Sequence, residues 1–316
     1  MNNKRTLITS VVAVLALSVA ACSNQDSEGP SNQKPSSTTE SGGSSNSIIS
    51  KIKTDKSLHN KLPSKIASSG VINVGADPGS PPDEYKDENG NFAGWEVDLA
   101  KAVGKTMGVK IKFTPLQFDS LIPSLQSKRI NMAIGQMGVT EQRETIIDQV
   151  AWLAGNELFA ARTDSSLKNI TKLTQLCGIN VATTRGSREQ EFAKDVKDKK
   201  KCEKLNKEPI NLHVFNGADQ AAHSVTNGRT DVFWLGSTAV SYFVKQSNGK
   251  AKIVGHYTDK AYIGPGFSKN SKLSPLVKQA IQKLIDGGSY ALLLKNWGLK
   301  DSAIANAQLN PTGTPK

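Results

Sequence analysis

Cysteine and histidine, the residues that most often hold metals or act as nucleophiles, are scarce in this chain. Among 316 residues there are three cysteines and four histidines. None of the histidines stands at ligand spacing from a cysteine, which makes a metal site the weaker reading; they are His59, His213, His223 and His256. No Ser/His/Asp or Cys/His arrangement is visible, and the acidic residues have no acid–base partner at a recognisable spacing. The sequence therefore predicts neither an enzyme nor a cofactor or metal.

Acidic residues are also in the minority, with 28 against 40 lysines and arginines and a formal net charge of +12. A basic chain favours anionic surfaces in general. The lysines, however, gather in runs such as residues 197–204, which are typical of a solvated helix face and contain no interleaved aromatic residues. Nucleic acid is therefore not a predicted partner.

Long apolar runs are missing except at the start of the chain. The stretch over residues 6–20 is about 15 residues long, short of the ~20 that a transmembrane helix needs. Lys4 and Arg5 precede it, and small residues close it. This order of a positive region, a short apolar region and small residues predicts a signal peptide over residues 1–21 rather than a membrane span.

The end of that segment, Val19-Ala20-Ala21-Cys22, resembles the lipobox of bacterial lipoproteins. The resemblance implies that the Cys22 thiol receives a diacylglycerol and that cleavage leaves it as the first residue. The protein is then expected outside the cytoplasm, anchored by lipid to the outer face of the cell membrane, or in the periplasm if the host is Gram-negative. The alternative is an ordinary signal peptide with an incidental cysteine.

Large apolar side chains are sparse after Cys22 and again at the end of the chain. Residues 23–60 are rich in serine, asparagine, glycine and proline. Such a segment buries too little surface to offset its ordering entropy. We therefore predict a flexible tether over residues 22–61 and a disordered tail over residues 301–316.

Once Cys22 is assigned to the anchor, the two cysteines that remain are Cys177 and Cys202. An even pair in an oxidising compartment predicts a disulfide, here closing a loop of about 25 residues. On the chain-entropy model such a bond is worth roughly 3–4 kcal/mol.

Between the tether and the tail, strand-like and helix-like segments alternate twice. Strands are predicted at residues 71–75, 110–114 and 132–135, with helices ending near 107 and spanning 121–128. The alternation restarts with strands at 178–183, 211–215 and 231–235 and helices from 187 and over 219–227, before two closing helices at 275–286 and 290–297. This order predicts two α/β lobes, each a mostly parallel sheet flanked by helices, with ligands beyond the carboxyl ends of the strands.

Five ordered segments carry a resemblance to a known family. They are residues 74–85 (VGADPGSPPDEY), 89–99 (NGNFAGWEVDL), 118–126 (FDSLIPSLQ), 140–143 (TEQR) and 228–231 (GRTD). Together they resemble the bacterial extracellular solute-binding proteins of family 3, over about residues 68–300. The resemblance implies a type II periplasmic-binding-protein fold, with lobe 1 built from residues 62–158 and 258–300, lobe 2 from 159–257, and two hinge strands near 156–161 and 253–262.

The same resemblance implies a function. The protein is expected to bind an amino acid or related small carboxylate between its lobes, as a monomer, and to deliver it to the permease of an ABC importer. Two alternatives remain open: an enzyme on the same scaffold, similar to cyclohexadienyl dehydratase, and a sensory lipoprotein that binds solute without transport.

The matching positions imply a set of ligand-binding residues. Arg143 is expected to hold the α-carboxylate of the ligand in a bidentate fork, since a guanidinium suits a carboxylate in a desolvated cleft. A turn that opens a helix is expected to present backbone N–H groups to the same carboxylate; it contributes Thr184, Ser187, Arg188 and Glu189. Apolar packing is expected from Phe118, contacts to the ligand ammonium from Gln136, Met137 and Gly138, and either a contact to a cationic side chain or a turn from Asp77.

Three positions depart from the family pattern. Ser80 stands where a stacking aromatic residue is common, and Asp83 stands where phenylalanine is usual. Gly236 takes the place of an aspartate that pairs with the ligand ammonium, and a buried ammonium without a carboxylate partner is costly. Either another acid serves instead, from among Asp77, Asp83 and Glu189, or the ligand is not a standard free α-amino acid.

Overall fold

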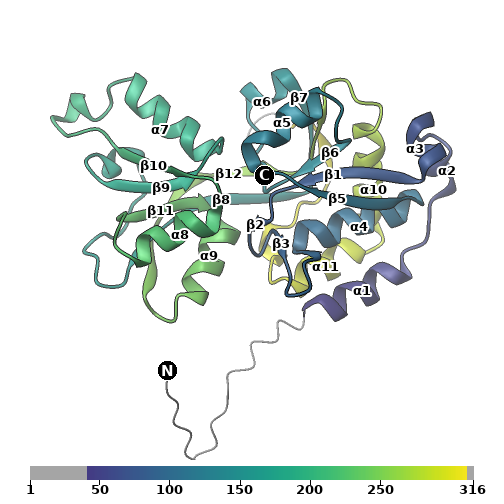
Figure 1. Ribbon diagram of the computed structural model, residues 1–316, viewed down its shortest axis with the longest axis horizontal. Coiled ribbons are helices and arrows are strands. Elements are labelled where there is room, and N and C mark those ends of the chain that lie inside the picture. Colours follow the sequence, from purple (N-terminus) through teal and green to yellow (C-terminus); the bar gives the residue numbers. More distant parts are fainter. Residues whose placement is uncertain (1–40, 312–316) are drawn as a thin grey trace, which may run out of the picture. The chain divides into compact units, whose positions relative to one another are not determined.

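Two β-sheets, each flanked by helices, organise the part of the chain that the computed structural model describes, residues 41–311 (Figure 1). The side chains of residues 41–44 and 258–259 are outside this description. The predicted signal peptide and the predicted lipid attachment site, Cys22, also lie outside the described residues. The described residues belong to one compact unit, in which each sheet forms the centre of one lobe.

The sheet of lobe 1 has six strands in the order β14-β7-β13-β6-β1-β5. Its parallel part consists of β1 (Val71–Ala76), β5 (Lys110–Pro115) and β6 (Met132–Ile134). The antiparallel part consists of β7 (Ile147–Ala151), β13 (Gly266–Ser268) and β14 (Gln308–Leu309). β1 lies inside the sheet, between β6 and the edge strand β5, and its side chains at Ile72 and Val74 are fully buried. This sheet is therefore mixed, with a parallel half that matches the predicted strands.

Helices cover both faces of this sheet. On one face lie α4 (Trp95–Met107), α10 (Ser274–Asp286) and α11 (Ser289–Asn296), whose apolar sides form the main core with β1. On the other lie α5 (Phe118–Gln126) and α6 (Glu141–Ile146), as Figure 1 shows. Leu121 and Leu125 of α5 pack there in a separate apolar cluster with Met137 and Ile147.

The sheet of lobe 2 has five strands in the order β10-β9-β11-β8-β12. Its parallel strands are β9 (Asn180–Thr184), β10 (Asn211–Phe215) and β11 (Val232–Gly236). One face packs against α7 (Arg188–Asp198) and the other against α8 (Ala218–Thr226) and α9 (Ser237–Gln246). The predicted two-lobed α/β fold is confirmed, with both sheets mixed.

Two long antiparallel strands connect the lobes. β8 (Leu153–Arg162) follows β7 directly after Trp152, and β12 (Ala251–Ile263) leads into β13. The two strands pair with each other from Leu153 opposite Ile263 to Arg162 opposite Ala251. The chain therefore passes from one sheet to the other twice, side by side, and the segments predicted as hinges fall within these strands.

The prediction of a flexible tether over residues 22–61 is wrong for residues 41–61. The structure has helices at α1 (Ser41–Lys51), α2 (Lys56–His59) and α3 (Ser64–Ser69). Ile48, Ile49 and Ile52 of the α1 segment pack against the lobe 1 core, and Leu58 is fully buried. Ile48 and Ile49 lie in the last turns of α1 and Ile52 follows its end, and the polar composition of the segment conceals these apolar residues.

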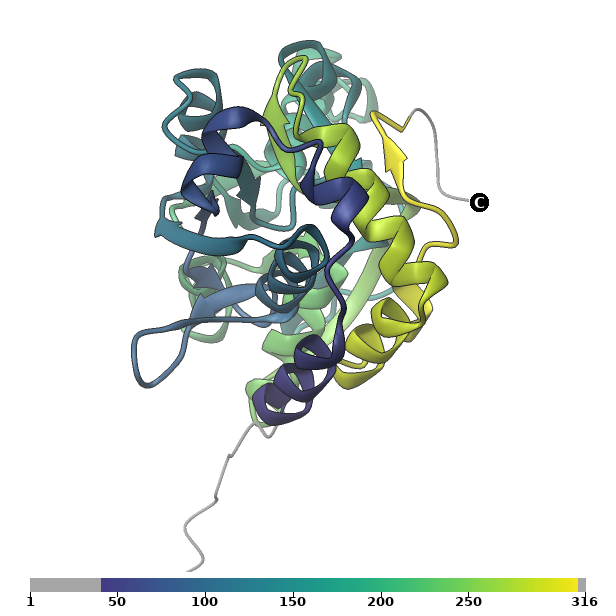
Figure 2. The ribbon, with the colours of Figure 1, turned by 90° about the vertical axis from the view of Figure 1, so that its right-hand side faces the viewer.

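The prediction of a disordered tail is also wrong for residues 301–311. After the short turn η3 (Lys300–Ser302), β14 pairs with the edge strand β7, and Ile304 and Ala307 are buried. The backbone N–H of Ile304 donates to the Tyr290 hydroxyl at 2.9 Å. Figure 2 shows β14, in yellow, at the edge of this lobe. Sequence composition alone misses this segment because it is ordered by contacts to α10, α11 and β7, which lie earlier in the chain.

The predicted disulfide between Cys177 and Cys202 is confirmed. The two Cα atoms lie 5.6 Å apart, and the residues are separated by 25 positions. Both cysteines are buried in the lobe 2 core, next to α7 and β9. The bond therefore joins the segment after α7 to the start of β9.

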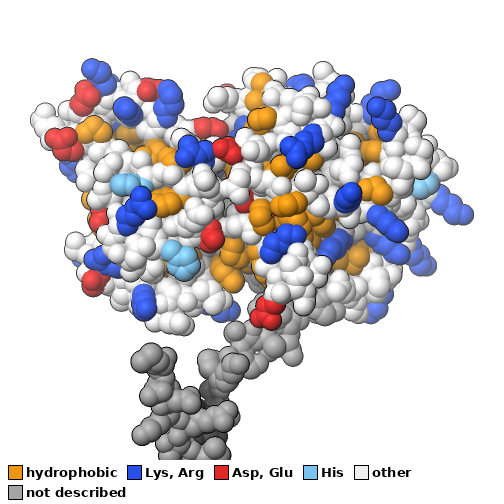
Figure 3. All heavy atoms as spheres, viewed as in Figure 1, with side chains coloured by type: hydrophobic (Ala, Val, Ile, Leu, Met, Phe, Trp, Pro, Cys, Tyr) orange, Lys and Arg blue, Asp and Glu red, His pale blue; other side chains and the backbone are white. Residues whose placement is uncertain are grey.

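The described residues contain neither a helix of the length and apolarity needed to cross a membrane nor a cluster of three or more potential metal ligands. On the face shown in Figure 3, lysine and arginine side chains are scattered rather than gathered in one patch. This distribution agrees with the solvated lysine faces expected from the sequence.

Candidate functional site

A pocket lies between the two lobes, at the carboxyl ends of β6, β9 and β11. This is where ligands sit in open α/β sheets. Lobe 1, lobe 2 and the two connecting strands all contribute side chains to it. The pocket-lining residues are Ser80, Asp83, Phe118, Gly135, Gln136, Gly138 and Arg143 from lobe 1; Gly155, Asn156, Glu157, Ala261 and Ile263 from the connecting strands; and Thr184, Ser187, Arg188, Glu189, Leu235 and Gly236 from lobe 2.

Eight of the ten predicted ligand-binding residues line this pocket, and Asp77 and Met137 do not. Met137 is fully buried in the apolar cluster beneath α5, and its carbonyl accepts a hydrogen bond from Gly264. Asp77 is buried in the loop after β1, where its carboxylate accepts from the backbone N–H groups of Gly79 and Phe118. Asp77 thus holds two loops together, the turn role that the sequence left open.

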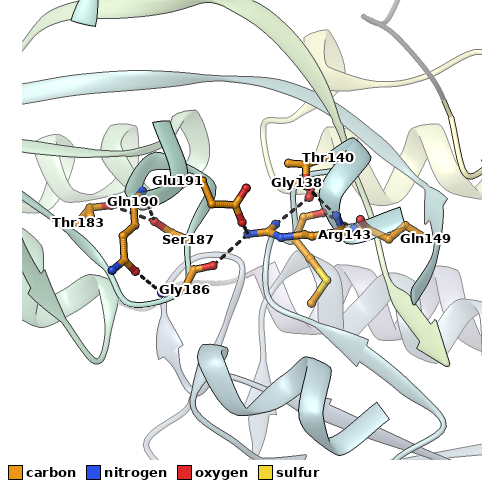
Figure 4. A network of polar contacts seen from close by, with 10 residues as sticks. Gly138, Thr140, Arg143, Gln149, Thr183, Gly186, Ser187, Gln190 and Glu191 are labelled. Carbon is orange, nitrogen blue, oxygen red and sulfur yellow. Dashed lines mark hydrogen bonds and ion pairs between the residues drawn. The ribbon is translucent and has the colours of Figure 1, made fainter. Parts of the chain in front are cut away.

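Arg143 links the lobes across the pocket. It lies in α6, whose first turn is capped by the Thr140 hydroxyl, and its side chain is almost fully buried. The guanidinium donates to the Gly138 carbonyl of lobe 1 at 2.8 Å and to the Gly186 carbonyl of lobe 2 at 3.0 Å (Figure 4). It also pairs with Glu191 of α7 at 3.3 Å.

Burial lowers the pKa of Arg143, while the carboxylates of Glu191 and Glu189 raise it. A guanidinium remains charged through any physiological pH. Its three contacts use part of its five-donor capacity, so donors remain for a ligand anion. Arg143 therefore places a permanent positive charge at the boundary of the two lobes.

The start of α7 forms the opposite wall. Ser187 is the N-cap, and its hydroxyl accepts from the Gln190 N–H at 3.3 Å and contacts the Thr183 hydroxyl (Figure 4). Gly186 before it has a φ of 74°, a left-handed conformation that favours glycine. The N–H groups of the first turn of a helix suit an anion. The Glu189 carboxylate hydrogen-bonds to its own backbone N–H and to Ser187. Burial raises the pKa of Glu189, and the positive charge of Arg188 opposes that shift.

Arg188 points into the pocket and forms an ion pair with Glu157 of β8. The exposed fractions of the two side chains are 13% and 3%. The Arg188 guanidinium also lies 5.1 Å from the centre of the Phe192 ring. Sequence analysis did not select Glu157; the one available signal was an acid within an otherwise mostly apolar strand.

Gln136 occupies the space beside Gly236. A Cβ atom added at Gly236 would overlap the Gln136 amide. Gln136 has a φ of 49°, donates its backbone N–H to Glu96 at 2.7 Å and directs its side-chain amide to the Thr238 hydroxyl of α9. The glutamine of lobe 1 thus fills the volume in lobe 2 that a side chain at position 236 would need.

Asp83 brings a fully buried carboxyl to the lobe 1 wall, beside the small sheet of β2 (Gly79–Ser80), β3 (Glu84–Lys86) and β4 (Phe92–Ala93). The Trp95 indole donates to it at 2.5 Å. Burial raises the pKa of Asp83 to about 7, and the nearby charge of Glu96 adds to this. Burial also raises the pKa of Glu96, and that of Glu84 even further because Glu96 lies beside it. The carboxyls of Asp83, Glu84 and Glu96 therefore bind protons at a higher pH than exposed carboxyls do.

Ser80 and Phe118 complete the lobe 1 wall. The Phe118 ring is half-buried and its centre lies 5.6 Å from the Arg143 guanidinium carbon, a distance suited to a cation–π contact. The aromatic surface at the pocket is therefore contributed by Phe118, while Ser80 adds a small polar side chain.

Known proteins are similar to this chain in sequence and in fold. The arginine-binding protein ArgT of Corynebacterium glutamicum is 29% identical over 250 residues, covering 79% of this chain and 81% of that protein. The lysine/arginine/ornithine-binding periplasmic protein of Escherichia coli K12 is 25% identical over 237 residues, covering 72% of this chain and 87% of that protein.

Among solved structures, an ancestral arginine-binding protein bound to arginine is 31% identical with a TM-score of 0.64, over 72% of this chain and 98% of that one. Holo ArgBP from T. maritima is 27% identical with a TM-score of 0.61, over 75% of this chain and all of that one (100%). The family model of the bacterial extracellular solute-binding proteins, family 3, matches residues 72–300. This chain belongs to that family.

Proposed function

We propose that this protein binds an amino acid in the pocket between its lobes and delivers it to the permease of an ABC importer. The observation that carries the proposal is the position of Arg143, which is buried at the boundary of the lobes, contacts both, and faces the start of α7. A guanidinium and a set of helix N-terminal N–H groups on opposite walls suit a ligand carboxylate. The names of the relatives, several of them arginine-binding proteins and one an ABC transporter protein, support this ligand class and this partner.

Binding between the lobes would couple to closure. A ligand that contacts Arg143 and Ser187 together bridges residues of lobe 1 and lobe 2, and contacts made only in the closed arrangement favour that arrangement. The paired strands β8 and β12 are the connections at which the lobes would move. Closure would be the signal that a permease reads.

The proposal includes the anchor, the monomeric state and a binding rather than catalytic role. Cys22 would hold the protein on the outer face of the membrane through its lipid. Relatives named for binding support a receptor over an enzyme. Metabolic labelling with a fatty acid, compared between the natural chain and Cys22→Ser, tests the anchor.

Calorimetric titration with L-arginine and the other common amino acids tests the ligand class. Arg143→Ala is expected to weaken binding of a carboxylate ligand by several kcal/mol, since the anion loses a charged partner in a desolvated site. Arg162→Ala is the matched control, because that arginine is exposed and far along β8 from the pocket. Binding that Arg143→Ala leaves unchanged contradicts the assignment.

A further inference from the structure

Glu157 stands at a distinctive place in the pocket. It lies on β8 directly opposite Gly236 of β11 and opposite Tyr257 of β12, so it is flanked on both sides in the sheet. Its side chain is 3% exposed and yet lines the pocket. The first turn of α7 lies over it, since Arg188 reaches its carboxylate from there.

One oxygen of this carboxylate lacks a partner. Arg188 engages Oε1, whereas the buried Oε2 has no hydrogen-bond partner among the described residues. A buried, charged oxygen without a partner is costly, and structural ion pairs normally satisfy both oxygens. Glu157 therefore retains a capacity to accept hydrogen bonds from a cation inside the pocket.

The group that pairs with Glu157 is itself informative. Arg188 is a guanidinium on a flexible stem, held at the pocket by this carboxylate and by the Phe192 ring. The desolvated, acidic end of the pocket thus already accepts a guanidinium from the protein's own chain. A ligand carrying a cationic group can make the same contact, with Arg188 swinging towards the pocket mouth.

We propose that Glu157 receives a cationic group of the bound amino acid, and that Arg188 is an internal competitor that the ligand displaces from this carboxylate. The inference rests on the proposed function and deepens it, because it names the residue that selects for positive charge. Glu157 lies on a connecting strand, so the residue that selects for ligand charge is located where the two lobes join.

The cation could be the ligand's side chain or its α-ammonium, and two ligands of similar shape separate these sources. L-Arginine and L-citrulline differ in the charge at the end of the side chain and share the α-ammonium. Calorimetric titration of the natural protein and of Glu157→Gln with both ligands gives four affinities. Glu203→Gln is the matched control, because Glu203 lies in lobe 2, is largely exposed and does not line the pocket.

Glu157→Gln is expected to weaken arginine binding by about tenfold to a hundredfold, as for loss of a buried charged partner. If the side-chain cation contacts Glu157, citrulline binding changes little; if the α-ammonium does, both ligands weaken in parallel. Either pattern supports the proposal. Unchanged affinity for both ligands in Glu157→Gln overturns it.

Arg188→Met tests the competitor. Removal of the guanidinium is expected to strengthen arginine binding about threefold to tenfold, because the ligand no longer has to displace it. A merely structural ion pair predicts the opposite, a lower melting temperature with equal or weaker binding, and that result overturns the competitor role. Thermal melting of each variant shows whether it folds.

Arg143→Ala keeps this inference separate from the function on which it rests. If the natural protein binds arginine and Arg143→Ala abolishes binding while Glu157→Gln does not affect it, the proposed function stands and the role of Glu157 fails. If the natural protein binds none of the amino acids, the proposed function itself fails.

Discussion

Gln136 and Gly236 are sterically complementary across the lobe boundary. The Gln136 amide fills the space in which a Cβ at position 236 would lie, and it reaches the Thr238 hydroxyl beyond. Gly236 has ordinary extended backbone angles, φ −55° and ψ 149°, so a side chain there is opposed by the Gln136 amide and not by the backbone conformation. The large side chain at position 136 therefore occupies the space left by the missing side chain at position 236.

Gly236→Asp alone is therefore expected to displace the Gln136 amide and to lower the free energy of unfolding by about 1 kcal/mol, the lower end of the cost of overpacking. Combining it with Gln136→Ala should recover most of this loss, since the alanine vacates the space. Thermal and chemical denaturation of the two single variants and the double variant measure the coupling. Strictly additive effects would show that the two residues do not share this volume.

Acidification is expected to stabilise the protein over part of the pH range. The pKa of Asp83 is about 7 in the folded protein against a reference of 3.8, so between these values the folded state holds a proton that the unfolded state has lost. The free energy of unfolding therefore falls as pH rises from about 4 to 7 and is level above 7. Asp77, with a pKa of about 6, acts in the same direction.

Asp83→Asn tests this effect, since the amide has the same shape and does not ionise. Melting temperatures should rise from pH 8 to pH 5.5 in the natural protein and rise less in the variant, because Asp83 contributes about 2 kcal/mol over this interval. Asp164→Asn serves as control because Asp164 is exposed. An identical pH profile in Asp83→Asn would count against the raised pKa.

The helix α1 is expected to contribute to stability. Ile49→Ala removes apolar contact with the lobe 1 core and should lower the free energy of unfolding by about 1–2 kcal/mol. Ser50→Ala should have little effect, because Ser50, the next residue of the same helix, is exposed. Urea denaturation compares the two. Equal stability of both variants would mean that this segment behaves as the tether that its composition suggests.

The disulfide is expected to contribute about 3–4 kcal/mol, from the entropy of closing a loop over 25 positions. The double variant Cys177→Ser/Cys202→Ser should lose this amount of free energy of unfolding and melt at a lower temperature. Its affinity for arginine should stay within twofold, since the bond does not line the pocket. Calorimetric melting and titration of the double variant measure both. A large loss of affinity at a temperature where the variant is folded would contradict this separation.

Much of the fold could be predicted because its signals are local. Periodic apolar residues predicted the strands and helices around Ile72, Leu121 and Val232, and the structure places β1, α5 and β11 there. The helices α1 and α9 and the strand β14 were missed. Each has a mixed composition; α1 and β14 are buried by elements far away in the chain, and α9 packs on the lobe 2 sheet.

The site residues also include some that local sequence could predict and some that it could not. Arg143 and Ser187 were predicted because each follows a strand end within a recognisable local motif, and the structure brings both to one pocket. Met137 was placed at the pocket by its neighbours in sequence, but the backbone turns at Gln136, whose φ is 49°, and the Met137 side chain enters the core.

By itself, the sequence determined the alternation of strands and helices, the pairing of two cysteines and the presence of an arginine after the third strand, because these depend on residues within one segment or on simple counting. Only the tertiary structure decided that Glu157 lies opposite Gly236 and beneath Arg188. Strand register and the docking of α7 on the sheet bring these three residues together, and neither is encoded within any one segment.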